Sequence, residues 1–184
     1  MNSVRIIGGE WRRRILRFPD SQGLRPTPDR VRETLFNWLG QKLDGQVCLD
    51  LFAGSGALGF EAASRGASRV VLVEKSAPVV AALKENAALL DPGGRLEIVR
   101  GDGVQYAAST KLQFDLVFLD PPFHQGWIGK LAPLLGPLLK DGALLYIEAE
   151  YAMENPGPPM TEWRTIRQGK AGEVHFHLMQ RESN

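Results

Sequence analysis

The segment Leu49–Gly59 constrains the fold of this chain more than any other feature of its sequence. An apolar run reaches Asp50 and Leu51 and is followed by three glycines spaced Gly54-x-Gly56-x-x-Gly59. Glycine tolerates a positive φ, so this spacing predicts a strand that ends in a tight turn and opens directly into a helix. A strand, a glycine turn and a helix in this order form the usual frame of a nucleotide-sized pocket in an α/β fold.

From Val47 onward, predicted strands and helices alternate. The strands cover residues 47–52, 69–74, 95–100, 114–119 and 143–148, and the helices cover about 56–65, 77–90, 103–109 and 127–139. Runs such as Val70–Val73 and Leu116–Leu119 are apolar almost throughout, which is typical of strands covered by helices on both faces. The alternation therefore predicts an α/β fold with a doubly wound, mostly parallel sheet.

The C-terminal part departs from this alternation. Residues Trp163–Gln168 and Glu173–Gln180 are predicted to be two strands joined by the turn Gly169–Gly172. A connection this short joins antiparallel strands. A mostly parallel, seven-stranded sheet that ends in an antiparallel hairpin is the Rossmann-like architecture of class I methyltransferases, whereas the simple dinucleotide-binding fold does not end in this way.

A separate N-terminal extension precedes the α/β unit. Residues Val4–Ile7 and Arg14–Phe18 predict a short hairpin around a turn at Gly8-Gly9. A helix follows, with apolar residues on one face and with Thr27 or Asp29 as its N-terminal cap. We expect two parts, a hairpin-plus-helix extension over residues 1–45 and an α/β domain over residues 46–184.

The charge of this extension differs from that of the rest of the chain. Residues 1–32 contain eight arginines and no lysine, against three acidic residues, although the whole chain has a net charge of only +1. A basic extension on a mildly acidic body favours an anionic polymer as partner, although a solvated surface strand would carry the same charge. Guanidinium groups pair with phosphates and stack on bases, so the use of arginine alone favours a nucleic acid.

Size and composition exclude several classes of protein. With 184 residues, 43% hydrophobic and 23% charged, we expect one globular domain with a small appendage. No apolar run reaches the roughly 20 residues of a membrane span, and the N-terminus lacks the layout of a signal peptide, so a cytoplasmic protein is expected. The sequence shows no heptad and no large exposed apolar stripe, so a monomer is expected. Cys48 is the only cysteine, and we expect no metal site because no zinc or iron–sulfur ligand set is present.

The glycine spacing alone does not identify the cofactor, because it also matches the dinucleotide fingerprint with Glu74 as the ribose-binding acid. The carboxylate of Asp50 would repel a pyrophosphate, but it would attract the ammonium and sulfonium groups of S-adenosylmethionine. Asp102, after the third strand, can accept a hydrogen bond from the adenine amine. The sequence therefore predicts an S-adenosylmethionine site formed by Asp50, Phe52, Ala53, Gly54, Ser55, Gly56, Glu74, Lys75, Asp102 and Gly103.

The motif Asp120-Pro121-Pro122-Phe123 follows the fourth strand and carries the predicted chemistry. The Asp120 carboxylate and the Pro121 carbonyl can accept both N–H groups of a nucleobase amine and turn its lone pair toward a methyl donor. The prolines hold these acceptors in place, and Phe123 offers a face on which a base can stack. A rigid turn without catalytic function is the alternative, but the position after a strand, downstream of the glycine turn, favours amine methylation.

Four segments of the chain match the pattern of a known family: Val4–Gly9, Leu24–Phe36, Asp50–Gly59 and Asp120–Phe123. They resemble the bacterial 16S rRNA guanine-N2 methyltransferases of the RsmD type, and the Leu24–Phe36 block is the most specific of them. The resemblance implies S-adenosylmethionine as donor, the N2 amine of guanine 966 of 16S rRNA as target, and the assembled 30S subunit as preferred substrate. It also implies phosphate contacts by Arg12, Arg13, Arg14, Arg25, Arg30 and Arg32.

Two other functions stay open at the level of sequence. An adenine-N6 DNA methyltransferase or a glutamine-N5 protein methyltransferase would use the same proline clamp. The arginines disfavour a protein substrate, and the chain has no separate target-recognition domain for DNA. A non-catalytic RNA-binding factor that keeps the pocket is the alternative from another class.

Overall fold

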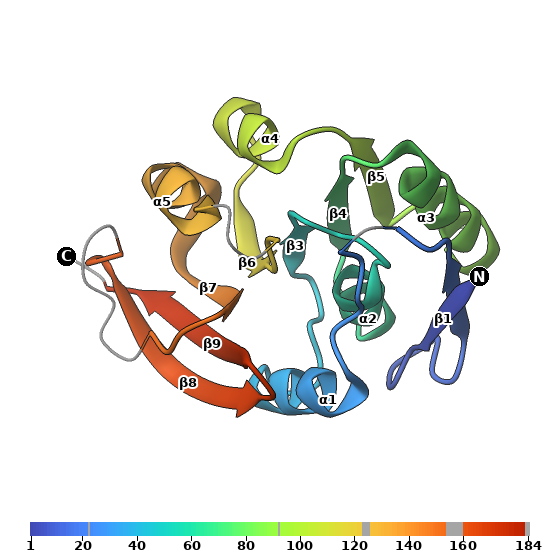
Figure 1. Cartoon of the computed structure of the whole chain (residues 1–184), viewed down its shortest axis with the longest axis horizontal. Coiled ribbons are helices and arrows are strands. Elements are labelled where there is room, and N and C mark those ends of the chain that lie inside the picture. Colours follow the sequence, from blue (N-terminus) through green and yellow to red (C-terminus); the bar gives the residue numbers. More distant parts are fainter. Residues whose placement is uncertain (22, 92, 123–125, 154–159, 183–184) are drawn as a thin grey trace.

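The computed structural model describes residues 1–21, 23–91, 93–122, 126–153 and 160–182 (Figure 1). Its main feature is a seven-stranded sheet in the order β5-β4-β3-β6-β7-β9-β8, in which β3 to β7 run parallel and β9 runs antiparallel to both of its neighbours, β7 and β8. These strands are β3 (Val47–Asp50), β4 (Arg69–Glu74), β5 (Leu96–Arg100), β6 (Phe114–Leu119), β7 (Leu139–Ala149), β8 (Trp163–Ala171) and β9 (Val174–Arg181). The predicted fold class is confirmed.

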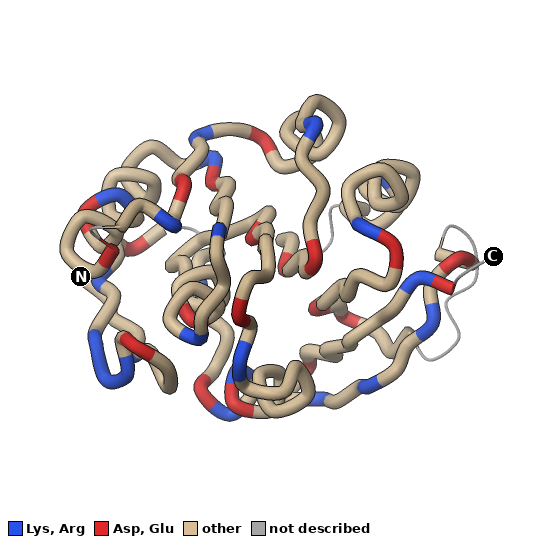
Figure 2. The backbone as a smooth tube through the Cα atoms, turned by 180° about the vertical axis from the view of Figure 1, so that it is seen from behind, with Lys and Arg blue, Asp and Glu red and all other residues tan. Residues whose placement is uncertain are grey.

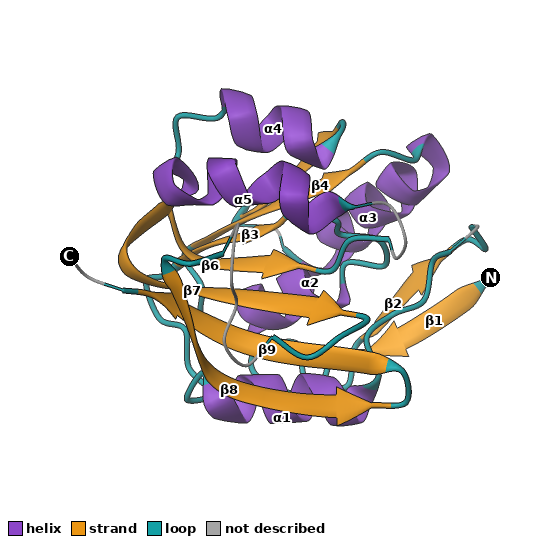
Figure 3. Cartoon of the chain, turned by 60° about the vertical axis from the view of Figure 1, so that its left-hand side comes forward, coloured by secondary structure: helices purple, strands orange, loops and turns teal. Residues whose placement is uncertain are grey.

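Helices cover both faces of the sheet, as Figure 3 shows for α1 on one side and for α4 and α5 on the other. The helices are α1 (Asp29–Trp38), α2 (Ala57–Ser64), α3 (Ala77–Leu90), α4 (Gly103–Ser109) and α5 (Trp127–Leu138). Residues of α1, α2 and α3 pack on one face of the sheet, and residues of α4 and α5 pack on the other. Two-sided burial explains why the central strands β4 and β6 are almost entirely apolar.

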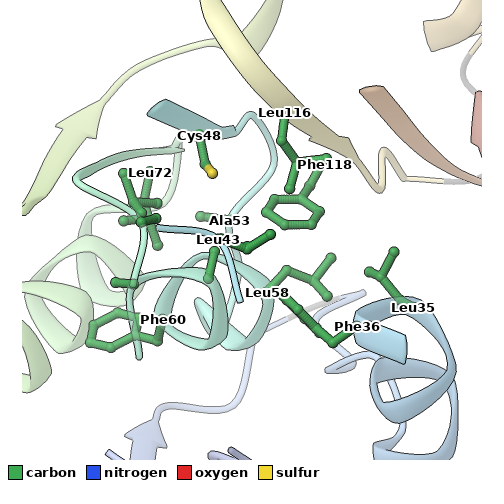
Figure 4. Close-up of a cluster of buried hydrophobic side chains, with 14 of the residues drawn as sticks. Leu35, Phe36, Leu43, Cys48, Ala53, Leu58, Phe60, Leu72, Leu116 and Phe118 are labelled. Atoms are coloured by element: carbon green, nitrogen blue, oxygen red, sulfur yellow. The ribbon is translucent and has the colours of Figure 1, made fainter. Parts of the chain in front are cut away.

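The core under α1 and α2 connects the N-terminal extension to the sheet. Figure 4 shows Phe36 of α1 and Leu58 of α2 facing Phe118 of β6. The rings of Phe36 and Phe118 lie 6.2 Å apart, and both side chains are fully buried. Ile6 and Leu16 of the extension belong to the same cluster. The division of the chain at residue 45 remains a prediction.

Several strand boundaries differ from the predicted ones, most of all those of β7 and of the C-terminal hairpin. Strand β7 begins at Leu139 rather than at residue 143, because Leu139 pairs with Phe114 before a register shift leads to the pair Leu116–Leu144. Strand β8 ends at Ala171 and strand β9 begins at Val174, so the turn between them is shorter than the predicted turn Gly169–Gly172. Gly172 in this turn has a φ of +59°, the left-handed conformation that tight hairpins require.

The N-terminal hairpin consists of β1 (Asn2–Arg5) and β2 (Ile15–Phe18), joined by a loop longer than the predicted glycine turn. The buried carboxylate of Glu61 in α2 accepts hydrogen bonds from the backbone N–H groups of Ile7 at 2.8 Å and Gly8 at 2.9 Å. This carboxylate therefore anchors the hairpin loop to the α/β unit.

The predicted cap of α1 is wrong. Pro28 is the N-terminal cap residue and makes no side-chain hydrogen bond to the helix. Asp29 is the first helical residue, and the Thr27 hydroxyl donates instead to Glu148 Oε2 at 3.0 Å. The local sequence is compatible with a helix cap at Thr27, but its hydroxyl instead bonds to Glu148, a residue 121 positions away in the chain.

Candidate active site

The strand order places five acidic side chains along one edge of the sheet. In the spatial order β5-β4-β3-β6-β7, the carboxyl ends of these strands carry Asp102, Glu74, Asp50, Asp120 and Glu148. Carboxyl ends of parallel strands lie at the same edge, where ligands of open α/β sheets bind. The predicted cofactor acids and the predicted clamp acid are thus brought together, in the order that the sequence implied.

The glycine turn between β3 and α2 has the predicted backbone geometry. Gly54 has a φ of +54° and Gly56 a φ of +82°. A Cβ atom on Gly56 would lie 2.7 Å from Leu83 Cδ2, so packing as well as backbone conformation requires glycine there. Glu74 Oε2 accepts the N–H of Gly54 at 2.8 Å, which ties the turn to the end of β4.

Asp50 lies beneath this turn and is 2% exposed. Its Oδ2 atom accepts the N–H of Gly59 at 3.0 Å, inside the first turns of α2. Burial raises the pKa of Asp50 to about 7; the bond from Gly59 lowers it, and the charges of Glu74 and Glu148 raise it. Asp50 is therefore a buried, conditionally charged group rather than an open surface acid.

The adenine side of the predicted site is formed at the start of α4. Asp102 is the N-terminal cap, and its Oδ1 accepts the N–H of Gln105 at 3.0 Å. Gly103 packs closely against Leu51 and Phe52. A Cβ atom added to Gly103 would lie 3.1 Å from the Leu51 carbonyl oxygen, so the backbone approaches here more closely than a side chain would allow. The Phe52 ring meets the Trp127 ring edge-on at 5.3 Å.

The remaining predicted cofactor residues fall into two groups. Ala53 and Ser55 are buried within the turn, where the Ala53 N–H donates to the Val73 carbonyl at 2.9 Å and the Ser55 hydroxyl accepts the Ala57 N–H at 3.2 Å. Lys75 is exposed beyond Glu74. The first group shapes the turn, while Lys75 is free to lie over a ligand.

The clamp begins directly where β6 ends. Asp120 is partly exposed, Pro121 is buried and Pro122 is exposed; Phe123 lies outside the described residues. Burial raises the pKa of Asp120 well above its usual value, and the charge of Glu148 and a hydrogen bond between the two carboxyl groups raise it further. Asp120 and Glu148 thus form a pair of carboxyl groups, of which Asp120 is the partly exposed one.

Sequence reasoning missed Glu148, which is 4% exposed at the end of β7. Burial raises the pKa of Glu148, whereas hydrogen bonds from its neighbours, including Asp120 and Thr27, lower it. The available signal was positional, because Glu148 ends the apolar run 143–148 as Glu74 ends 69–74.

Five of the six predicted RNA-binding arginines are exposed: Arg12, Arg13, Arg14, Arg25 and Arg30. Figure 2 shows basic residues gathered on the loop of the N-terminal hairpin. A surface cavity of about 370 Å³ lies between this hairpin and the loop before α1, lined by Arg5, Pro26, Thr27 and their neighbours. Arg25 and Arg30 therefore stand at either end of the segment that lines this cavity, whereas Arg12, Arg13 and Arg14 lie on the hairpin loop, which docks on the C-terminal end of α2.

The predicted RNA contact of Arg32 is wrong. This side chain is 1% exposed and donates to the carbonyl oxygens of Thr27 at 3.0 Å and Arg5 at 2.9 Å. It also pairs with Asp29 and with Glu61. Its guanidinium makes all of these contacts inside the protein, where it connects α1 to the hairpin and to α2. It therefore cannot reach a phosphate.

Over the described ranges, no group of three or more histidine, cysteine or acidic side chains is arranged to hold a metal ion. His177, on β9, is buried and accepts the backbone N–H of Met153 at 2.9 Å, which is a packing role. Among the same residues, no helix is long and apolar enough to cross a membrane.

The donors at the glycine turn decide which ligand fits. A pyrophosphate would need free backbone N–H groups at the start of α2. Here the N–H of Gly54 is bound by Glu74 and that of Gly59 by Asp50, so carboxylates occupy the places that a phosphate would use. The site fits a cationic adenosine compound such as S-adenosylmethionine. Fold and site together define a class I methyltransferase.

Comparisons with known proteins specify the family. The family described as "Conserved hypothetical protein 95" matches residues 4–180, and the chain belongs to it. Ribosomal RNA small subunit methyltransferase D of Escherichia coli K12 is 44% identical, over 98% of this chain and 91% of that protein. The protein of the same name from Haemophilus influenzae is 41% identical, over 96% of this chain and 93% of its own length.

Solved structures agree with this assignment. The Escherichia coli protein yhhF superposes with a TM-score of 0.86 at 43% identity, and the match covers 100% of both chains. An RNA methyltransferase from Salinibacter ruber, solved with S-adenosyl-L-homocysteine, gives a TM-score of 0.68 at 19% identity over 87% of this chain and 95% of that one. The latter likeness concerns the fold alone.

Proposed function

We propose that this protein transfers a methyl group from S-adenosylmethionine to the exocyclic N2 amine of guanine 966 of 16S rRNA, in the assembled 30S subunit. The main support comes from the glycine turn. Carboxylates accept the hydrogen bonds of its N–H groups, so the site is suited to a cation rather than to a phosphate. Relatives at 44% and 41% identity are named as small-subunit rRNA methyltransferases, which supports rRNA as substrate. The resemblance of Leu24–Phe36 and of the clamp supports the guanine amine.

The cofactor would lie along the acidic edge of the sheet. When bound, S-adenosylmethionine supplies an activated methyl group on a positively charged sulfur. The charge of Asp50 beneath the turn favours that cationic end. Glu74 keeps lone pairs for the ribose hydroxyls, and Asp102 keeps its second carboxyl oxygen for the adenine amine. Phe52 and Gly103 would line the adenine side.

The clamp would position the acceptor amine. Asp120 and the Pro121 carbonyl accept the two N–H groups of the guanine amine, so that its lone pair points toward the methyl carbon. The buried Pro121 fixes the backbone between these acceptors. The sulfonium is already an activated leaving group, so most of the acceleration comes from orientation of the two reactants.

The RNA would reach the clamp across the arginine-bearing extension. Arg25 and Arg30 adjoin the segment Pro26–Asp29, which lines the cavity that includes Thr27. Thr27 in turn bonds to Glu148 beside the clamp. RNA phosphates held by Arg25 and Arg30 would therefore lie close to the reacting edge, while those held by Arg12, Arg13 and Arg14 would lie farther away, beside the C-terminal end of α2.

Transfer of labelled methyl groups tests the proposal. Purified protein is incubated with labelled S-adenosylmethionine and, separately, with 30S particles lacking the modification, naked 16S rRNA, DNA and total protein. We expect label in 30S particles, located by mass spectrometry on the N2 of guanine 966. Label in DNA or protein alone would overturn the RNA assignment, and no label in any acceptor would favour a non-catalytic RNA-binding factor.

The variant Asp120→Ala tests the clamp. It should abolish methylation, because one of the two acceptors for the amine is lost. Binding of S-adenosylhomocysteine should stay within about tenfold, or about 1.4 kcal/mol, since Asp50, Glu74 and Asp102 are unchanged. Asp141→Ala, an exposed acid on β7, is the matched control. Normal methylation by Asp120→Ala would refute the clamp mechanism.

A further inference from the structure

Glu148 lies beside Asp120 at the reacting edge of the sheet. The parallel register of β6 and β7 pairs Phe118 with Tyr146 and Leu119 with Ile147, so the next position on each chain brings Asp120 next to Glu148. Side chains alternate between the faces of a strand, so Asp120 and Glu148 project on the same face as Phe118 and Tyr146. The rings of these two aromatic residues lie 6.2 Å apart, which fixes the row below the carboxyl pair.

The two carboxyl groups differ in access to a substrate. Glu148 is 4% exposed, whereas Asp120 is partly exposed. The Thr27 hydroxyl donates to Glu148 Oε2 at 3.0 Å and so fixes one of its oxygens. Glu148 is therefore held too deep to touch a nucleobase, and it can act on one only through Asp120.

The surroundings of the pair are acidic or neutral. Asp50 on β3 faces Asp120, and Tyr146 lies next to both carboxyls, with its buried hydroxyl directed at Glu148. On the side of α1, Arg32 donates to the Thr27 carbonyl but is paired with Asp29 and Glu61. Over the described residues no salt bridge reaches Asp120 or Glu148. A proton is thus the available means of relieving their mutual repulsion.

We propose that Glu148 is a positioning residue for amine methylation, which orients the Asp120 carboxyl and stabilises the proton that Asp120 takes from the methylated amine. The inference rests on the proposed function. A bond forms between N2 and the methyl carbon while the sulfur–carbon bond breaks, and its electron pair remains on sulfur as a neutral thioether. The amine nitrogen becomes positively charged and gives one proton to the Asp120 carboxylate. Protonated Asp120 then donates a hydrogen bond to Glu148, and the proton passes to water as product leaves.

This arrangement has a consequence for the rate at low pH. Asp120 must be ionised to accept the amine, and the charge of Glu148 opposes that ionisation. The acid limb of the kcat profile should therefore lie at a higher pH in the native enzyme than in Glu148→Gln. We expect the substitution to move this limb down by about one pH unit or more. On the alkaline plateau kcat should fall, because the amide is a poor acceptor for the Asp120 proton.

The experiment measures kcat against pH with 30S particles for four proteins. Glu148→Asp should keep the native acid limb because it keeps the charge. Glu173→Gln, at the exposed tip of the β8–β9 hairpin, is the matched control and should be unchanged. Binding of S-adenosylhomocysteine, measured by calorimetry, reports whether each variant is folded. An unshifted limb in folded Glu148→Gln would overturn the inference, as would an equal shift in Glu148→Asp.

If Glu148→Gln does not fold, carboxyl carbon NMR of the native protein decides. We expect Asp120 and Glu148 to titrate in two separate steps, the second of which lies above the ordinary range of a carboxyl group. Simultaneous titration at the ordinary acidic pKa values would overturn the inference. The proposed function fails in a different way, since then the native protein would not methylate rRNA at any pH.

Discussion

Asp50 is buried, yet in the proposed function its negative charge attracts the cationic end of S-adenosylmethionine. Its pKa of about 7 in the folded protein lies well above the value of about 3.9 for an unfolded chain. The folded state therefore holds this proton more tightly than the unfolded state does. Below about pH 4, Asp50 does not change the free energy of unfolding. As the pH rises from about 4 to about 7 that free energy falls, and above this range it is lowered by the full cost of the buried charge.

The variant Asp50→Asn should flatten this dependence. Its amide oxygen can still accept the Gly59 N–H, but it has no charge to bury. We expect the free energy of unfolding, measured with urea at pH 5, 6, 7 and 8, to fall less steeply than in the native protein. Asp141→Asn, in an exposed position, should leave the slope unchanged. A slope equal to that of the native protein in Asp50→Asn would show that Asp50 does not titrate in this range.

At the scale of elements, the turn into α2 depends on both backbone conformation and packing. Gly56 and Gly45 have similar positive φ values, +82° and +76°, but a Cβ on Gly56 would meet Leu83 and Phe60 whereas one on Gly45 would meet nothing. Both substitutions to alanine pay about 1–2 kcal/mol for the left-handed conformation. Gly56→Ala should lose about 1–3 kcal/mol more through overpacking. Urea unfolding of the two variants measures the difference, and equal losses would contradict the packing argument.

How far the sequence predicts an element depends on how local its causes are. The strands β4 and β6 were predictable because burial on both faces leaves an uninterrupted apolar run. Strand-end acids such as Glu74 and Asp102 were predictable because they come at or just after the end of a predicted strand. The cap at Thr27 was mispredicted because its hydroxyl bonds to a residue 121 positions away. No local pattern encodes such a partner.

Arg32 illustrates the same limit for the candidate site. In the sequence it is one of several arginines in a basic segment, and nothing nearby distinguishes it from Arg30. Only the folded chain brings it to Glu61, 29 positions further on, and buries both. The glycine turn, by contrast, was predictable in detail because its φ values are set by the residues within it.

At the scale of the whole molecule, basic residues occur on several separate parts of the chain (Figure 2). Two of these parts are the hairpin loop with Arg12, Arg13 and Arg14, and the edge strand β8 with the exposed residues Arg164, Arg167 and Lys170. Long-range attraction would draw RNA to either surface, but only direct contacts release counterions in proportion to their number. The two surfaces can therefore be compared at equal charge.

Replacing Arg12, Arg13 and Arg14 by glutamine should weaken RNA binding and reduce its dependence on salt. Each lost contact with single-stranded RNA lowers the slope of log K against log salt by about 0.7. The triple variant at Arg164, Arg167 and Lys170 removes the same charge and is the control. Filter binding of 16S rRNA at several salt concentrations measures both. An unchanged slope in the hairpin variant, or an equal loss in the control, would exclude a specific phosphate contact by the hairpin.

The anchoring of the hairpin by Glu61 also sets the order of events during synthesis. Translation releases Ile7 and Gly8 more than fifty residues before the carboxylate that binds their N–H groups, since the separations are 54 and 53 positions. Until α2 has emerged, the most basic part of the nascent chain has no docking partner. A product truncated before residue 61 would carry these arginines on an unanchored peptide.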